Sequence, residues 1–179
     1  LIGFVGGLWT VLRFATGQNK VKNKFQNFYI DFMETTLLEV IKQNIRLQLD
    51  AGAEIVMMFD SGISDLDNNF FRGKYQLLLK NISNSFPNKV GYYARGKTYN
   101  EISYLSDLPF AGLGVDNGVN MQHIFSNSKF GFIQGNFDEK NLLLDTKELE
   151  NELHIFSESM KNMDNLDGWV CGLGHGINK

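Results

Sequence analysis

The sequence predicts an α/β fold built on a parallel sheet, and three observations lead to this prediction. Six short apolar runs of strand length alternate along the chain with longer segments whose apolar residues recur at helical spacing. Capping residues mark two helix starts and one helix end. Neighbouring parallel strands need a crossover connection, and a helix supplies one with the required handedness. Repeated strand, loop and helix units therefore indicate strands that all run in the same direction.

The six expected strands are spread over the whole chain. They are Leu1–Val5, Glu54–Phe59, Lys89–Ala94, Ala111–Val115, Phe130–Gln134 and Trp169–Leu173. Six strands fit an open doubly wound sheet, and they also fit six of the eight units of a (β/α)8 barrel. The strands themselves do not choose between the two. Neither Gly3–Gly7 nor Gly112–Gly114 has the glycine spacing of a dinucleotide-binding loop, which argues against an open sheet of that kind.

Helices are expected where apolar residues fall on one face of a helical projection. One lies within residues 71–86, a second within residues 149–163, and a third runs from Thr35 to Asp50 and stops at Ala51-Gly52. A short oxygen acceptor precedes a glutamate by three residues, as a capping box requires, at two places: Thr98 with Glu101, and Asp145 with Glu148.

Composition restricts the class of protein. The 179 residues include 17 basic and 20 acidic side chains, a net charge of −3, and 13% aromatic residues, which is typical of a globular chain. We expect a single domain over residues 1–179. No dense basic block is present, so we expect no nucleic-acid partner, and the cluster Lys20, Lys22 and Lys24 is interpreted as a solvated segment. No run approaches the ~20 apolar residues that cross a bilayer, so we expect no membrane partner.

The single cysteine, Cys171, also limits the possibilities. One thiol cannot form an intramolecular disulfide or a multi-thiolate zinc site, so the chain is expected in a reducing compartment, with the cytoplasm preferred. Because Cys171 falls within the last expected strand, its side chain is predicted to be buried. The sequence contains none of the common zinc-binding motifs, and we expect no metal site.

Candidate functional residues follow the ends of the expected strands, because ligands bind at the carboxyl ends of parallel strands in both architectures. These residues are Trp9, Thr10, Asp60, Ser61, Arg95, Asp116, residues 135–138 and His175. His175 stands between two glycines, so it is interpreted either as a carboxylate-binding or proton-transferring group, or as a histidine of a surface turn. Asp60 and Ser61 fit a ligand-binding pair and a helix N-cap equally well. His123 and His154 fall within helices and are expected to be structural or solvated.

Four motifs in order make the sequence similar to one family. They are Leu1–Thr10, Asp50–Ala53 leading to Met58–Ser61, Gly135–Asp138, and Leu173–Ile177. Together they resemble the uroporphyrinogen decarboxylase family over nearly the whole chain. The resemblance implies a (β/α)8 barrel, usually a homodimer, of which this chain covers about the third to the eighth strand. An incomplete barrel exposes sheet edges and part of its interior, so the isolated chain is expected to be inactive and either to be unstable or to aggregate.

The resemblance also implies a reaction. The family removes carbon dioxide from the four acetate side chains of the tetrapyrrole uroporphyrinogen, giving coproporphyrinogen, and it uses no cofactor. The resemblance gives Ser61 and His175 as catalytic residues that bind substrate carboxylates, and Phe59 as an apolar wall of the substrate pocket. Phe14 falls at the position of the family's active-site tyrosine. The family's arginines and its pyrrole-binding aspartate precede the residues present here.

Several positions depart from the family pattern. Phe14 keeps an aromatic ring but has no hydroxyl, Leu8 and Glu139 stand where prolines are expected, and Gly172 stands where asparagine is usual. These departures leave two other interpretations open. One is a porphyrinogen-binding paralogue without catalysis, and the other is a corrinoid-linked methyltransferase on the same barrel. The methyltransferase would need a zinc site with at least three protein ligands, for which the sequence offers no cluster.

Overall fold

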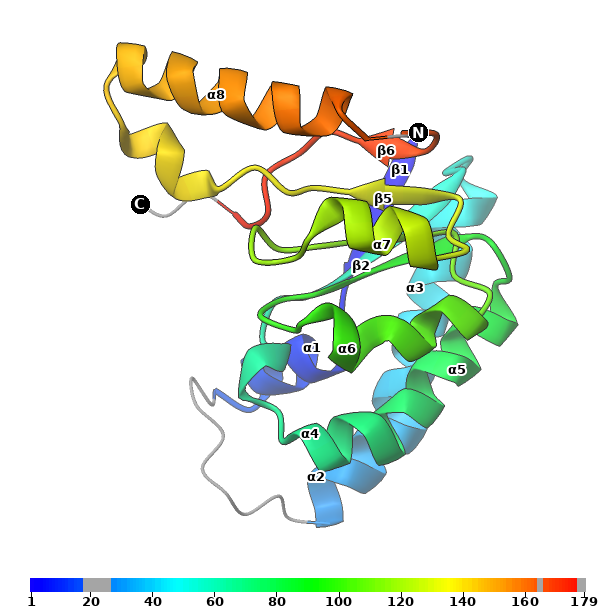
Figure 1. Ribbon diagram of the computed structural model, residues 1–179. Helices are drawn as coiled ribbons and strands as arrows, with labels where there is room; N and C mark the ends of the chain where they lie inside the picture. Colours follow the sequence, from blue (N-terminus) through cyan, green and yellow to red (C-terminus); the bar gives the residue numbers. More distant parts are fainter. Residues whose placement is uncertain (18–26, 164–165, 177–179) are drawn as a thin grey trace.

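A computed structural model describes residues 1–17, 27–163 and 166–176 of the chain (Figure 1). The lysine cluster at positions 20, 22 and 24 lies outside these residues. All six predicted strands are present, each beginning or ending within a few residues of its predicted boundary. They are β1 (Ile2–Gly6), β2 (Ile55–Asp60), β3 (Val90–Ala94), β4 (Gly112–Gly114), β5 (Phe132–Gln134) and β6 (Trp169–Val170).

Strand order selects the barrel over the doubly wound sheet. The strands form one parallel sheet in which spatial order follows chain order, from β1 to β6. A doubly wound sheet reverses its strand order at a switch point, and this sheet does not. The connecting helices α3, α5, α6 and α7 accordingly lie on one side of the sheet (Figure 1). The fold is α/β, and six consecutive parallel strands are the arrangement of a partial barrel.

Helices and helical turns connect the strands. They are α1 (Leu8–Ala15), α2 (Asn27–Phe32), α3 (Leu38–Asp50), α4 (Asn68–Phe70), α5 (Gln76–Ser85), α6 (Tyr99–Ile102), α7 (Met121–Asn127) and α8 (Thr146–Lys161). Turns of π-helix, Met33–Leu37 and Phe71–Tyr75, lead into α3 and α5, and 3₁₀ turns cover Ile63–Asp65, Ser103–Asp107 and Glu139–Leu143. Within the part of the chain that the structure describes, each helix is too short or too polar to span a membrane.

The predicted helix signals are present in the structure. Gly52 follows α3 with a φ of +99°, a conformation that glycine adopts without steric cost. Thr98 and Glu101 form the complete capping box at the start of α6. Asp145 accepts the backbone N–H of Glu148 at 2.9 Å and caps α8. These local contacts fix where each helix begins or ends.

The hydrophobic core lies between the sheet and its helices. Val56 and Met58 alternate along β2, are fully buried, and belong to one apolar cluster with Ile41 and Ile45 of α3. Burying one such side chain contributes ~2 kcal/mol to folding. This layer is where most of the apolar residues of the predicted helices and strands meet.

The other face of the sheet carries the inner layer of the barrel. Met57, Gly91, Gly112 and Phe132 are neighbours in register across four strands, so their side-chain positions share this face. A Cβ on Gly91 would overlap the Met57 sulfur, and a Cβ on Gly112 would overlap the Phe132 ring. The two glycines thus leave room for two large side chains to fill the space over β3 and β4.

The last strand is shorter than predicted. β6 ends at Val170, so Cys171 lies beyond it and is exposed. The prediction that this thiol is buried is therefore wrong, because the strand ends before residue 171.

The first strand exposes apolar side chains on the inner face of the sheet. On β1, Ile2 and Phe4 face the inner side and are 60% and 74% exposed. β1 and β6 are the edges of the described sheet, each with one neighbour.

We expect the polypeptide of residues 1–179, expressed alone, to self-associate, because β1 presents apolar side chains and an unpaired strand edge to water. Size-exclusion chromatography with light scattering should show species larger than a monomer. Phe4→Lys should increase the monomer fraction. Leu77→Lys, which removes an exposed leucine from the outer surface of α5, should not. A wild-type monomer that unfolds cooperatively would contradict this prediction.

Candidate active site

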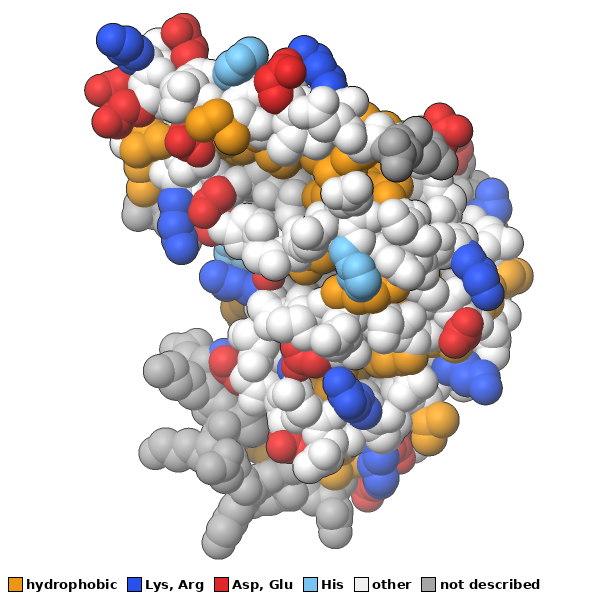
Figure 2. Space-filling model, viewed as in Figure 1, with side chains coloured by type: hydrophobic (Ala, Val, Ile, Leu, Met, Phe, Trp, Pro, Cys, Tyr) orange, Lys and Arg blue, Asp and Glu red, His pale blue; other side chains and the backbone are white. Residues whose placement is uncertain are grey.

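The candidate site is a cleft at the carboxyl ends of the strands. A cavity of about 530 Å³ is lined by residues that end or follow β2, β3, β4, β5 and β6. A smaller pocket of about 280 Å³ lies against α1. Ser61 and Arg95 line both, so the two spaces adjoin. Figure 2 shows the molecule hollowed at the left of the view.

The four site residues expected from the resemblance come together in this cleft. Phe59, Ser61 and His175 line the larger cavity, and Phe14 and Ser61 line the smaller pocket. His175 is more than 100 residues away in the chain from the other three. Their meeting follows from the parallel order of the strands, which brings every carboxyl end to one edge of the sheet.

One row of the sheet forms the floor of the larger cavity, and only Phe59 of its four residues is among the site residues predicted from the sequence. Phe59, Tyr93, Gly114 and Gln134 are neighbours in register and all line the cavity. A Cβ on Gly114 would lie 3.1 Å from the Tyr93 ring, so the glycine accommodates the tyrosine. The signal available in the sequence was the alternation of side chains along each strand, which becomes useful only when the register is known.

The Asp60 carboxylate is buried and accepts hydrogen bonds from three elements. Thr10 of α1 donates its backbone N–H at 3.0 Å and its hydroxyl at 2.7 Å to Oδ1. Tyr75 and Tyr92 donate their hydroxyls to Oδ2. Asp60 therefore lies beside the cleft and not in it. Asp60 caps the start of α1 and its oxygens are occupied by donors of the protein, so the ligand-binding interpretation of Asp60 is wrong.

Burial controls the ionisation of this cluster. Desolvation raises the pKa of Asp60 above its ordinary value, and the hydrogen bonds from Tyr75 and Thr10 oppose that rise. Burial and the neighbouring Asp60 charge raise the pKa of both Tyr75 and Tyr92 well above their ordinary values. The two tyrosines therefore stay protonated and remain donors to the carboxylate.

Ser61 is held on both sides by this network. The backbone N–H of Gly62 donates to the Thr10 hydroxyl at 2.9 Å, and the Gly62 carbonyl accepts from Arg13 at 3.1 Å. Arg13 also forms an ion pair with Asp65 at 3.1 Å. The Ser61 hydroxyl itself is half-buried and has no hydrogen-bond partner among residues 1–17, 27–163 and 166–176. It is thus a fixed polar group available to a ligand.

The loop that carries His175 is anchored from the neighbouring strands. Gly174 donates its N–H to the Phe137 carbonyl at 2.7 Å, and a Cβ on Gly174 would overlap the backbone at Asn117. The His175 Nδ1 lies 2.8 Å from the Gly176 carbonyl. Because a carbonyl oxygen only accepts, this contact places a proton on Nδ1 and leaves Nε2 to meet a ligand.

Asp116 joins the loops that follow four strands. Its carboxylate accepts from the Tyr93 hydroxyl and the Gly96 backbone N–H. The same Tyr93 hydroxyl lies 3.0 Å from the Gly174 carbonyl oxygen. Asn136 donates to the Asp116 carbonyl at 2.9 Å. Burial, with the Asp116 contact, raises the pKa of Tyr93 and keeps its hydroxyl protonated.

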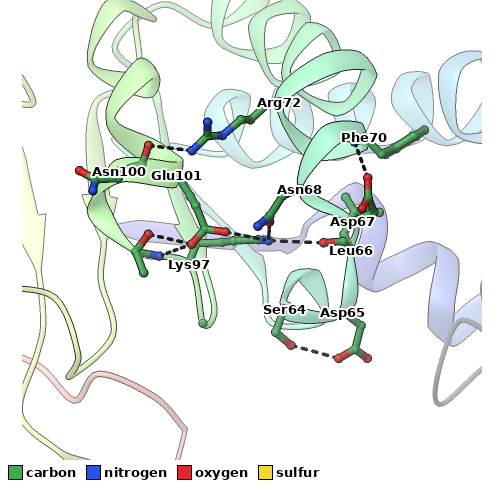
Figure 3. A network of polar contacts seen from close by, with 12 residues as sticks. Ser64, Asp65, Leu66, Asp67, Asn68, Phe70, Arg72, Lys97, Asn100 and Glu101 are labelled. Carbon is green, nitrogen blue, oxygen red and sulfur yellow. Dashed lines mark hydrogen bonds and ion pairs between the residues drawn. The ribbon is translucent and has the colours of Figure 1, made fainter.

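A buried lysine fixes the base of the loop that carries Arg95. Figure 3 shows Lys97 reaching from this loop to the segment after β2, where its Nζ donates to Asn68 at 2.7 Å and contacts the Leu66 carbonyl at 3.4 Å. Glu101 pairs with Lys97 at 3.4 Å. The ammonium also lies 5.0 Å from the centre of the Phe71 ring. Lys97 thus connects the loops that carry Arg95 and Ser61.

The remaining candidates lie elsewhere. Trp9 is buried in the core, and Thr10 lines the smaller pocket while bonded to Asp60. Asp138 accepts the Lys140 N–H and caps a 3₁₀ turn. His123 and His154 are exposed on α7 and α8. Over the described residues, no three His, Cys, Asp or Glu side chains come close enough to hold a metal ion.

Comparison with known proteins finds one family. The family model described as "Uroporphyrinogen decarboxylase (URO-D)" matches residues 1–179. The chain is 28% identical over 194 residues to uroporphyrinogen decarboxylase of Orientia tsutsugamushi (strain Ikeda), covering 99% of this chain and 55% of that protein. It is 26% identical over 191 residues to that of Rickettsia bellii (strain RML369-C), covering 99% of this chain and 55% of that protein. It is 24% identical over 189 residues to that of Bacillus subtilis (strain 168), covering 99% of this chain and 52% of that protein. The chain spans about half the length of these curated relatives.

Asp60→Ala should lower the free energy of unfolding by about 3 kcal/mol or more, because it leaves several buried donors without an acceptor. Asp107→Ala, at an exposed carboxylate, should change it by less than about 0.5 kcal/mol. Chemical denaturation of the protein expressed from its complete gene measures both. Equal stabilities of the two variants would contradict the role given to Asp60.

The same carboxyl should make stability depend on pH. A raised pKa means that folded Asp60 keeps its proton where the unfolded chain has released it. The resulting stabilisation is fully present below the ordinary value of 3.8 and is lost as pH rises through the folded-state pKa. Asp60→Asn should remove this decline from denaturation curves measured at successive pH values. An unchanged pH profile would argue against a titrating Asp60.

Tyr93→Phe should displace the His175 loop, because it removes the hydroxyl between Asp116 and the Gly174 carbonyl. We expect a loss of about 1–2 kcal/mol in unfolding free energy and faster amide hydrogen exchange at residues 173–176. Tyr104→Phe is the matched control, because the buried Tyr104 hydroxyl has no hydrogen-bond partner in the described structure. Exchange that is equally slow in both variants would contradict the role of Tyr93.

Proposed function

Because the chain belongs to the uroporphyrinogen decarboxylase family, we propose that the protein removes carbon dioxide from the acetate side chains of uroporphyrinogen and forms coproporphyrinogen without a cofactor. The observation that carries this proposal is the meeting of Phe14, Phe59, Ser61 and His175 in one cleft at the carboxyl ends of the strands. In this proposal residues 1–179 are one incomplete barrel domain.

The cleft has the chemistry that a polycarboxylate ring requires. Phe59, Val115 and Leu173 supply apolar surface in the larger cavity, and a tetrapyrrole presents apolar faces to such walls. Ser61 offers a hydroxyl donor, and His175 offers Nε2, which donates to a carboxylate when the ring is protonated. Both groups stand on anchored loops, so they hold carboxylate side chains at fixed positions.

Catalysis in this proposal depends on an electron sink within the substrate. Loss of carbon dioxide from an acetate leaves an electron pair on the adjoining carbon, and a pyrrole protonated on a ring carbon accepts that pair. A proton then adds to the exocyclic carbon and the ring carbon releases the proton it had taken up, so that one hydrogen replaces the carboxylate. Ser61 and His175 contribute by holding the substrate so that the reacting acetate lies over the apolar part of the cleft. Their contribution is therefore orientation of the substrate's other carboxylates.

Phe14 favours a second candidate function. Its ring is 80% exposed and lines the smaller pocket, and phenylalanine has no hydroxyl to hydrogen-bond near a reacting group. A protein that binds a porphyrinogen without releasing carbon dioxide would retain Ser61 and His175 and dispense with that hydroxyl. The two functions differ in turnover and not in binding.

The proposal carries two further expectations from the family resemblance. We expect the protein expressed from its complete gene to form a homodimer in the cytoplasm. Sedimentation velocity measures the oligomeric state, and fractionation of the source cells measures the location.

Anaerobic incubation of the complete protein with uroporphyrinogen tests the proposed function. Chromatography of the oxidised products should show porphyrins with seven to four carboxylates. Recovery of only the eight-carboxylate porphyrin from protein that binds it would favour the binding function. In that case Phe14→Tyr separates the causes, because restored turnover would identify the missing hydroxyl as the defect.

His175→Ala should weaken substrate use by about 1–3 kcal/mol, or 5- to 150-fold in kcat/KM, because it removes a polar partner of a substrate carboxylate. His154→Ala, an exposed histidine of α8 away from the cleft, is the matched control and should leave kcat/KM unchanged. If His175→Ala behaves like His154→Ala, the role proposed for His175 is wrong.

A further inference from the structure

The smaller pocket contains an arginine that the proposed function has not used. It is lined by Thr10, Arg13, Phe14, Gly17, Ser61, Gly62 and Arg95, with no acidic residue among them. Its volume of about 280 Å³ accommodates a short side chain of a ligand but not a tetrapyrrole ring. Two guanidinium groups, two hydroxyls and an aromatic ring therefore surround a space beside the larger cavity.

The two arginines differ in their partners. Arg13 is paired with Asp65 and bonded to the Gly62 carbonyl, so its charge is balanced within the protein. Arg95 is exposed and forms no hydrogen bond or ion pair with any residue the structure describes. A guanidinium offers five N–H donors in a planar fork, which matches a carboxylate bidentately. Arg95 is thus the arginine of this pocket whose N–H donors are available to a ligand.

Arg95 also supplies a permanent positive charge to the larger cavity. Its lining contains no other lysine or arginine among the described residues. A ligand with several carboxylates would therefore meet one permanent positive charge on this part of the cleft, at the boundary between the two spaces. Ser61 stands at the same boundary and offers a second donor.

The backbone on both sides of Arg95 is fixed, although its side chain is exposed. Ala94 is buried in β3, and Gly96 donates its N–H to Asp116. Lys97 is tied to Asn68 and Glu101 (Figure 3). A guanidinium on an anchored backbone loses little freedom beyond its own rotamers when it binds an anion.

We propose that the smaller pocket is a carboxylate subsite, in which Arg95 binds one carboxylate-bearing side chain of the substrate while the ring occupies the larger cavity. This inference rests on the proposed function and assigns a binding residue to it. The aromatic ring of Phe14 contacts the carbon chain of that side chain, and Arg95 meets its end. The side chain is either one of the acetates or one of the four carboxylate side chains that decarboxylation spares.

Binding measurements on the complete protein test this proposal. Quenching of porphyrin fluorescence gives the Kd of uroporphyrin, with eight carboxylates, and of coproporphyrin, with four. Arg95→Gln should raise the Kd of uroporphyrin about tenfold or more, and Arg95→Lys should recover part of that loss. Arg46→Gln is the matched control, because Arg46 lies over the Phe86 ring on the helical side of the sheet. An equal loss for both porphyrins identifies a spared side chain, and a loss for uroporphyrin alone identifies an acetate.

Steady-state kinetics supply the second readout. Arg95→Gln should raise KM for uroporphyrinogen and leave kcat within about twofold, because a remote carboxylate contact acts equally in ground and transition states. Unchanged Kd and KM, or a fall in kcat alone, would overturn the subsite while leaving the proposed function in place. Wild-type binding without turnover would overturn the proposed function, and the Kd values would still test whether Arg95 binds a carboxylate of the porphyrin. Absence of wild-type binding and turnover would overturn both.

Discussion

The buried carboxylate of Asp60 is the interaction on which the candidate site depends. An ionised carboxylate without hydrogen bonds is costly to bury, and here neutral donors from α1, from the turn before α5 and from β3 offset the cost. These donors converge only when the three elements are docked. Gly7 directly precedes α1, and a Cβ at this position would overlap the Asp60 side chain. The carboxyl end of β2, and with it Ser61, is therefore fixed by the packing of the surrounding barrel.

The polar side chains in and beside the cleft fall into two groups, those that bind other parts of the protein and those that do not. Asp60, Asp116 and Lys97 are occupied by hydrogen bonds that connect loops from different strands. Ser61 and Arg95 have no side-chain partner among the described residues. The first group sets the positions of the second before any ligand arrives, which lowers the cost of binding. Neither Phe14 nor Glu139 takes part in these anchoring hydrogen bonds.

Local structure was predictable from the sequence because its causes are local. Short apolar runs between segments of helical spacing predicted the six strands, and Thr98 with Glu101 predicted the start of α6. The choice between a barrel and an open sheet was not predictable from the strands, because strand order is a property of the whole sheet. Asp60 shows the same limit within the site. Its partners lie 15 to 50 residues away, so no spacing near Asp60 indicated that it caps α1. Cys171 was misplaced because a strand end shifted by a few residues.

The central claim is that the cleft bounded by Ser61 and His175 holds a tetrapyrrole with its carboxylates on these side chains. The most direct measurement is an anaerobic crystal structure of the protein expressed from its complete gene with coproporphyrinogen bound. We predict the ring in the larger cavity, with carboxylate oxygens within hydrogen-bond distance of Ser61 Oγ and His175 Nε2. A ring bound outside this cleft, with both side chains still facing solvent, would contradict the account.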